Sequence, residues 1–203
     1  MKDRLRSSTG SRLDKIVANM RQQLRLHPDS HSVAVAGIDV EIARPRPGSL
    51  ELSYIVTGQM SSIRRPSAVA NARSDGLWRH TCFEAFIRAA PDAQYYELNF
   101  SPSGQWAAYQ FSGYRNGMRM ANEITEVPIE MRSSPDGCAL QASLSLDQFR
   151  DLPRDRSWRL GLSAVIEDAT GGISYWALAH PPGKPDFHHA DNFACEFSPA
   201  VTP

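Results

Sequence analysis

Most of this chain consists of short apolar runs separated by turn signals, and that pattern constrains the fold more than any other feature. From Val33 onward the runs are rich in β-branched and aromatic residues, with glycines and prolines between them. Such spacing is typical of strands in an all-β sandwich or barrel. The strands expected from it are 32–42, 49–58, 81–88, 95–101, 105–113, 123–132, 137–146, 158–167, 173–178 and 192–197.

Alternation and turns indicate how these strands pair. Apolar residues occupy every second position from Cys138 to Leu146, which predicts a strand with one solvent-facing side. The run from Trp158 to Ile166 repeats the pattern. The Gly171-Gly172 turn predicts a hairpin, and the turn "SPSG" predicts antiparallel pairing of 95–101 with 105–113. The fold class expected is a two-sheet antiparallel, jelly-roll-like β-sandwich.

The first residues have a different pattern, which favours one N-terminal amphipathic helix. Ser11 and Asp14 are placed to cap its start, and His27-Pro28 follows its end. We therefore expect residues 1–27 to be a polar segment with a helix, and 28–203 to be a single β-sandwich domain. The apolar residues at helical spacing are Leu13, Ile16, Val17, Met20 and Leu24.

Composition limits the classes of partner and compartment. The chain has 22 basic and 22 acidic side chains, so its overall field attracts neither nucleic acid nor an anionic membrane. Cys82, Cys138 and Cys195 lack CxxC spacing and are expected to be buried thiols. No apolar run approaches the roughly 18 residues that span a bilayer, and no signal-like segment begins the chain. These features predict a soluble, cytoplasmic protein.

Glu84 lies within an otherwise apolar strand. A carboxylate buried there without a partner is costly, so we expect it to be paired or hydrogen-bonded. The sequence leaves three candidate partners, Arg79, Arg88 and Arg115.

Four segments together resemble a known family. The order "LWRHTCFEAFI", "YYELNFSPSGQWAAYQF", "WRLGLSAVIED" and "YWALAHPPGKPDFHHADNF" resembles the DOMON-like domains related to type 9 carbohydrate-binding modules, in particular a stand-alone bacterial group of unassigned activity. The resemblance covers residues 28–197. It implies a β-sandwich that binds sugars or haem in a concave pocket. In the carbohydrate-binding relatives two tryptophans clamp the sugar ring; Trp78 and Trp176 look similar to these, and Glu84 to an acid that grips hydroxyls.

The resulting hypothesis is a non-catalytic binding module for a saccharide or a related polyhydroxylated metabolite. Trp78 and Trp176 would stack on the ring, Glu84 and Asn99 would bind hydroxyls, and Arg79 would orient Glu84. Trp158 is expected in the core, whereas Trp106 fits the core or the ligand equally well. In "HPPGKPDFHHADNF" the side chains of Lys184, Asp186 and His188 either face the mouth of the pocket or belong to a surface loop without a binding role. The candidate ligand-binding residues are Trp78, Arg79, Glu84, Asn99, Trp106, Trp176, Lys184, Asp186 and His188.

Other functions stay open on the sequence alone. Adjacent His188 and His189 would point to opposite faces of an extended segment, so no metal site is predicted, and no cofactor is assigned. Haem held by His180 or His188, with Met118 or Met120 as a further axial ligand, is one alternative. A glycoside or cell-wall metabolite hydrolase using Glu84 and Asp186 is another, although no catalytic residue is assigned. The last is a structural or interaction protein that forms a homodimer through its first helix.

Overall fold

The computed structural model describes residues 20–198, which form an all-β protein of twelve strands and four short 3-10 turns. The strands are β1 (Met20–Leu26), β2 (Val35–Ala43), β3 (Ser49–Gly58), β4 (Cys82–Ala89), β5 (Tyr95–Phe100), β6 (Trp106–Phe111), β7 (Arg119–Met120), β8 (Ile129–Ser134), β9 (Gly137–Ser145), β10 (Trp158–Glu167), β11 (Ile173–Ala177) and β12 (Cys195–Phe197). The 3-10 turns are η1 (Met60–Ser62), η2 (Leu77–Arg79), η3 (Leu146–Gln148) and η4 (Ala190–Asn192).

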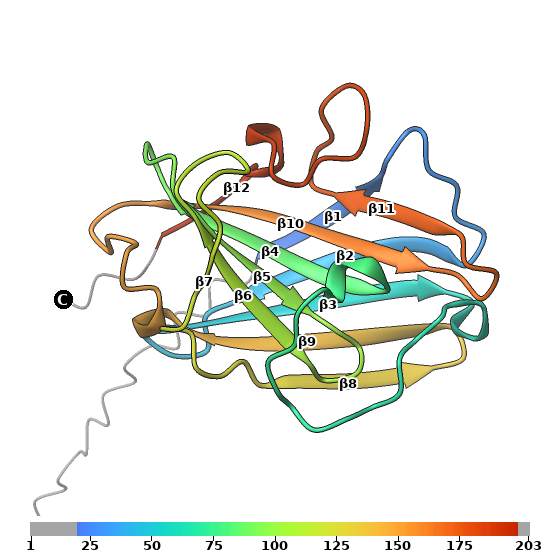
Figure 1. Ribbon diagram of the computed structural model, residues 1–203. Coiled ribbons are helices and arrows are strands. Elements are labelled where there is room, and N and C mark those ends of the chain that lie inside the picture. The colour runs from blue at the N-terminus through green and yellow to red at the C-terminus, as the bar shows by residue number, and fades with distance from the viewer. Residues whose placement is uncertain (1–19, 199–203) are drawn as a thin grey trace, which may run out of the picture.

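The strands form one curled antiparallel sheet that folds over itself as two layers. Hydrogen bonding follows the order β7-β6-β5-β4-β10-β11-β1-β2-β3-β9-β8, and β12 pairs with β10. β1 joins the two halves, because its first residues pair with β2 while Arg25 and Leu26 pair with β11. In Figure 1 strands β4 to β7 and β10 to β12 form a front layer that crosses a back layer of β2, β3, β8 and β9.

The main hydrophobic core lies between these layers. β9 alternates buried and half-buried residues as expected, with Cys138, Leu140, Ala142 and Leu144 turned inward. Across the layers, the ring of Tyr54 lies 5.0 Å from that of Phe83, and its hydroxyl donates to the carbonyl of Glu84 at 2.7 Å. Trp158 is fully buried, which confirms the prediction that it belongs to the core.

The outer face of the front layer is covered as well. Almost every residue of β4, β5, β6 and β10 is buried, so the solvent-facing side expected for 158–167 is wrong. Residues of η2 and of 178–194 pack against this face and contribute to a second apolar cluster that includes Phe86, Tyr95, Phe111, Phe187 and Phe193.

The strand predictions hold for most of the chain. Residues 49–58 and 158–167 form strands with the expected bounds, and both predicted antiparallel pairings are confirmed. The strand expected at 123–132 begins only at Ile129, and the two-residue strand β7 has too little sequence to be recognised. The jelly-roll order stays a prediction.

The N-terminal helix is wrong where it can be assessed. Met20–Leu26 is a strand, with Met20 opposite Ile42 and Leu24 opposite Ile38. Met20 and Leu24 are four residues apart, a spacing that places them on one face of either a helix or a strand, so pairing with β2 decides. The earlier part of the expected helix lies outside the described residues.

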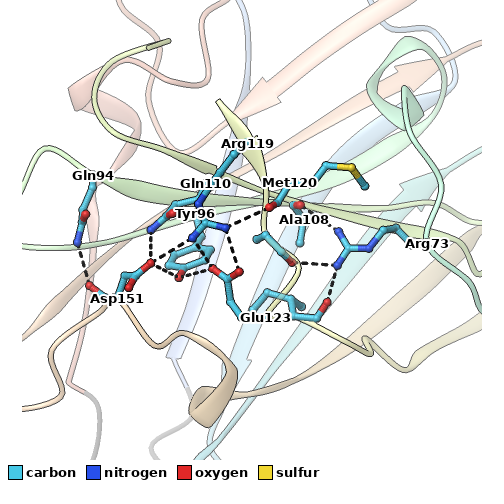
Figure 2. A network of polar contacts seen from close by, with 11 residues as sticks. Arg73, Gln94, Tyr96, Ala108, Gln110, Arg119, Met120, Glu123 and Asp151 are labelled. Carbon is cyan, nitrogen blue, oxygen red and sulfur yellow. Dashed lines mark hydrogen bonds and ion pairs between the residues drawn. The ribbon is translucent and has the colours of Figure 1, made fainter. Parts of the chain in front are cut away.

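A polar network fastens the irregular segments beside β6 to the front layer (Figure 2). The Tyr96 hydroxyl donates to Glu123 at 2.8 Å, and Arg119 donates to both oxygens of Glu123 at 3.0 and 2.9 Å. Gln110 donates to Asp151 at 2.7 Å, and Arg119 lies 3.2 Å from the same carboxylate oxygen. Beside this group, the guanidinium of Arg73 donates to three main-chain carbonyls, those of Ala108, Ala121 and Ile124.

Candidate functional site

A cavity of about 540 Å³ opens on the outer face of the front layer. The middle strands β5, β4 and β10 form its floor, and residues of β6, β11 and three loops form its walls. Its volume falls within the range of roughly 300–1,000 Å³ that is usual for small-molecule sites. The lining residues are Trp78, Glu84, Glu97, Tyr109, Phe111, Arg115, Met118, Val165, Tyr175, Pro185, Phe187 and His188.

Two carboxyl groups lie on the floor. Glu84 on β4 and Glu97 on β5 share the outer face because Glu84 pairs with Asn99, two residues from Glu97. Glu84 is 3% exposed and Glu97 6% exposed. No hydrogen bond reaches the Glu84 carboxyl group from residues 20–198, so the pairing expected from the sequence is not made within the described part of the protein.

Both floor acids hold their protons more tightly than ordinary glutamates. Burial raises the pKa of Glu84 well above its usual range, and the charge of Glu97 raises it further, while Arg115 opposes both. Burial also raises the pKa of Glu97, against a hydrogen bond from Asn99 and the charge of Arg115. The cause in each case is the loss of water around the ionised form.

Asn99 sets the position of Glu97 from beneath. It is fully buried, and its amide nitrogen donates to Glu97 at 2.8 Å while its oxygen accepts from the thiol of Cys82 at 3.5 Å. Asn99 does not line the cavity. It therefore holds one floor acid in place rather than facing the cavity itself.

Aromatic side chains form much of the wall. Trp78, on η2, is 40% exposed and meets Tyr109 edge to face with ring centroids 5.9 Å apart. Gly76 precedes this turn with φ of +73°, a conformation that a glycine adopts at little cost. Elsewhere in the lining, the rings of Tyr175 and Phe187 lie 6.1 Å apart.

Arg115 forms an ion pair with Asp186 at the rim of the cavity. Its Nε and Nη2 both donate to one oxygen of Asp186, at 3.2 and 2.7 Å, and Tyr114 donates to the other oxygen. Arg115 adopts φ of +50°, a left-handed conformation that costs about 1–2 kcal/mol for a residue with a side chain. The ion pair, together with a 3.2 Å hydrogen bond from its N–H to Tyr95, holds this conformation.

His188 enters the lining as a neutral ring. Burial lowers its pKa to about 4, with a further contribution from Arg115 and against the charge of Asp186. Because the Tyr95 hydroxyl accepts from Arg115, its own hydrogen is free to donate to Nδ1 of His188 at 2.7 Å. Nε2 then carries the remaining hydrogen and faces Glu97 at 3.7 Å. His180 does not line this cavity, and its Nε2 lies 2.8 Å from the Arg25 carbonyl.

The loop that carries His188 is fixed to the floor from behind. Asn192 is fully buried and donates to the carbonyl of Phe187 at 2.8 Å. Its amide lies against Gly161 of β10, where a Cβ atom would come within 2.9 Å of it. His189 turns away and accepts from the N–H of Asp191 at 3.3 Å, as a cap of η4.

The structure brings together some of the residues chosen from sequence. Trp78, Glu84 and His188 line the cavity, and Asp186 lies on its rim through Arg115. The hydrolase alternative paired Glu84 with Asp186, but Asp186 is held by Arg115 and Tyr114.

Four other chosen residues lie elsewhere. Trp176 and Trp106 face the core between the layers and are 5% and 3% exposed, so neither lines this cavity. Arg79 makes no hydrogen bond or ion pair with Glu84 within the described residues, and its guanidinium lies 5.9 Å from the ring centroid of Trp78. Lys184 is exposed beside the lining residue Pro185.

Sequence reasoning left most of the lining unassigned. Glu97 and Tyr109 are direct cross-strand partners in the predicted hairpin. Once the register of that hairpin is known, both side chains can be placed on the same face of the sheet. From the sequence, Arg115 was named only as a partner for Glu84.

Within residues 20–198 no group of three or more His, Cys, Asp or Glu side chains is arranged to hold a metal ion. Across the same residues, no helix has the length and apolar character needed to cross a membrane.

Comparison with known proteins gives a likeness of fold. No protein-family model and no curated protein matches the sequence. A crystal structure of a candidate carbohydrate-binding protein from Bacteroides uniformis is similar, with a TM-score of 0.60 over 85% of this chain and 83% of that one. The two sequences are 15% identical, so what the comparison shows is a shared fold.

Proposed function

We propose that the cavity on the front layer binds a small polyhydroxylated molecule, a saccharide or a related metabolite, and does not change it chemically. Sugar rings present weakly apolar C–H faces and hydroxylated edges. Aromatic walls together with a few convergent polar groups suit both parts of such a molecule. Trp78 and Tyr109 offer ring surface, and Glu84, Glu97 and Arg115 offer polar atoms within one cavity.

The observation that carries the proposal is the Glu84 carboxyl group. It is 3% exposed, lies on the cavity floor and has no hydrogen-bond partner within residues 20–198. A largely buried carboxyl group that opens on a cavity is well placed to exchange a hydrogen bond with a ligand. A ligand hydroxyl that enters the cavity would complete this bond.

Two similarities support the sugar class. The sequence resembles DOMON-like domains and type 9 carbohydrate-binding modules in the segments that carry Trp78, Glu84 and the loop around His188. The similar fold from Bacteroides uniformis also belongs to a candidate carbohydrate-binding protein. Fold alone does not fix function, so the cavity residues carry the argument.

A thermal-shift screen of mono- and oligosaccharides followed by calorimetry tests the proposal. A sugar that binds the native state raises the melting temperature by mass action. Replacing Trp78 or Glu84 by alanine is expected to weaken its binding at least tenfold, which corresponds to about 1.4 kcal/mol.

The matched controls are Ile173→Ala and Glu130→Ala. Ile173 is as exposed as Trp78, at 40%, and the Glu130 side chain is 69% exposed; neither residue lines the cavity. Both control variants should bind as the wild type does. The absence of any stabilising sugar, or undiminished binding by Trp78→Ala and Glu84→Ala, would refute the proposal.

A further inference from the structure

The charged groups of the cavity are unevenly balanced. Three carboxyl groups, those of Glu84, Glu97 and Asp186, lie near a single arginine, Arg115. Arg115 directs both Nε and Nη2 to Asp186 and makes no hydrogen bond to either floor acid. The floor acids therefore have no cation in direct contact among residues 20–198.

The other groups around Glu84 and Glu97 carry no compensating charge. From β5 Asn99 contacts Glu97, and from β10 Ser163 lies opposite Glu84 with its hydroxyl buried and unpaired. Cys82 adds a buried thiol from β4. His188 faces Glu97 as a neutral ring, and Tyr109 directs its hydroxyl to Asp75.

The walls favour a positive charge in the same space. The faces of aromatic rings carry negative potential and attract cations, most strongly where water is excluded. Five aromatic residues line the cavity together with the floor acids: Trp78, Tyr109, Phe111, Tyr175 and Phe187. A neutral sugar would use these rings as flat surfaces only, whereas a cation would also gain from their electrostatic potential.

We propose that the ligand of this cavity carries a protonated amine that lies against Glu84 and Glu97, so that the saccharide is an amino sugar. The sugar part of this inference rests on the proposed function. The amine part rests on a carboxyl group that is 3% exposed, directed into the cavity and unpaired within the described residues.

Binding of this kind changes the protonation of the floor. In the free protein, burial and mutual repulsion favour at least one protonated carboxyl group. When an ammonium group arrives, the ionised carboxylate becomes the better partner, and the displaced proton passes to the buffer. Affinity for an amino sugar therefore rises with pH while the amine remains charged. A neutral sugar gains nothing of this kind, because its hydroxyls can hydrogen-bond to the carboxyl group in either protonation state.

Calorimetry on the full chain with glucosamine, galactosamine and mannosamine tests the inference. Each is compared with its parent hexose and its N-acetyl derivative, at about pH 6.5 where an amine is protonated. Phosphate and HEPES buffers, whose protonation enthalpies differ, report any proton released. At least one amino sugar is expected to bind tenfold or more tightly than both of its neutral counterparts and to release a proton on binding.

Two variants and a control sharpen the result. Glu84→Gln and Glu97→Gln keep the shape of the floor and should reduce the preference for the amino sugar at least tenfold, while Glu130→Gln should leave it unchanged. A preference that survives both floor variants would contradict the inference.

The outcomes separate this inference from the proposed function. If neutral sugars bind as tightly as amino sugars, or if amino sugars bind without releasing a proton, the amine inference falls and saccharide binding stands. If ethanolamine or tetramethylammonium binds while no sugar does, saccharide binding falls and the cation site stands. If none of these compounds binds, both are wrong.

Discussion

Two acidic clusters on the front layer are built in opposite ways. Glu123, in the network of Figure 2, accepts two hydrogen bonds from Arg119 and one from Tyr96. Although burial acts to raise it, these bonds bring the pKa of Glu123 down to about 2. Glu84, on the cavity floor, has no such bond, and burial raises its pKa well above the ordinary range.

The difference separates acids that support the fold from acids that are available to a ligand. Glu123 and Asp151 join β5, β6 and β7 to the segments that follow them, and their charges are matched by Arg119. Glu84 and Glu97 are more deeply buried, at 3% and 6% exposed, but have no cation in direct contact within residues 20–198. An arrangement that costs stability and surrounds a cavity is typical of a functional site.

The largest expected effect on the free energy of unfolding comes from a change in the cluster around Glu123. Glu123→Ala removes the partner of Arg119 and leaves the Tyr96 hydroxyl short of its closest acceptor. We expect a loss of about 2 kcal/mol in the free energy of unfolding at pH 7, measured by urea denaturation, after allowance for the solvent around Arg119. The exposed control Glu130→Ala should change it by less than about 0.5 kcal/mol.

The pH dependence of Glu123 follows from the same contacts. Its pKa in the folded state is about 2, below the unfolded value of about 4.3. Its stabilising contribution is therefore complete above pH 4.3 and is lost as the pH falls towards 2. The difference between wild type and Glu123→Gln should shrink over that window. A difference that stays constant down to pH 2 would argue against the pairing.

An effect of opposite sign and smaller size is expected on the cavity floor. Glu84 has a raised pKa in the folded state, so the folded protein binds more protons than the unfolded one above about pH 4.3, and stability falls as the pH rises. Glu84→Gln avoids this loss and should be more stable than wild type by about 1 kcal/mol at pH 8. Destabilisation at pH 8 would mean that Glu84 has a structural partner.

A smaller effect is expected for an exposed member of the cluster around Glu123. The Asp151 side chain is 46% exposed and accepts from Gln110. Because water can replace much of what is lost, Asp151→Asn should reduce the free energy of unfolding by about 0.5 kcal/mol. A loss as large as that of Glu123→Ala would show that the two acids act as one unit.

The smallest effect is expected at Lys184, which the sequence placed at the pocket mouth. Its side chain is exposed and lies outside the lining. Lys184→Ala should alter stability by less than about 0.5 kcal/mol and should leave the binding of any sugar found in the screen unchanged. A clear loss of binding would extend the site towards this residue.

The fold was largely predictable from the sequence because its signals are local. Alternation in 137–146 and the turns "SPSG" and "TGGI" act over a few residues, and the strands they predict are present. β1 was mistaken for part of a helix, since its apolar spacing fits both forms and the pairing that decides involves β2 and β11.

The site was less predictable because it depends on which face each strand turns outward. Trp176 and Tyr175 are adjacent in the chain, yet Trp176 lies in the core and Tyr175 lines the cavity. A shift of one residue in register exchanges them. Glu97 meets Glu84, Arg115 and His188 only through the packing of separate strands and loops, which no local pattern records.

The most direct measurement is a ¹³C NMR titration of the glutamate carboxyl groups in the free protein. The account predicts that the pKa of Glu84 lies well above the usual range and that of Glu123 well below it, with the pKa of Glu97 raised by burial. If Glu84 and Glu97 instead titrated at or below about 4.3, as solvated or salt-bridged acids do, the claim that the cavity floor holds buried acids without a matching cation would be contradicted.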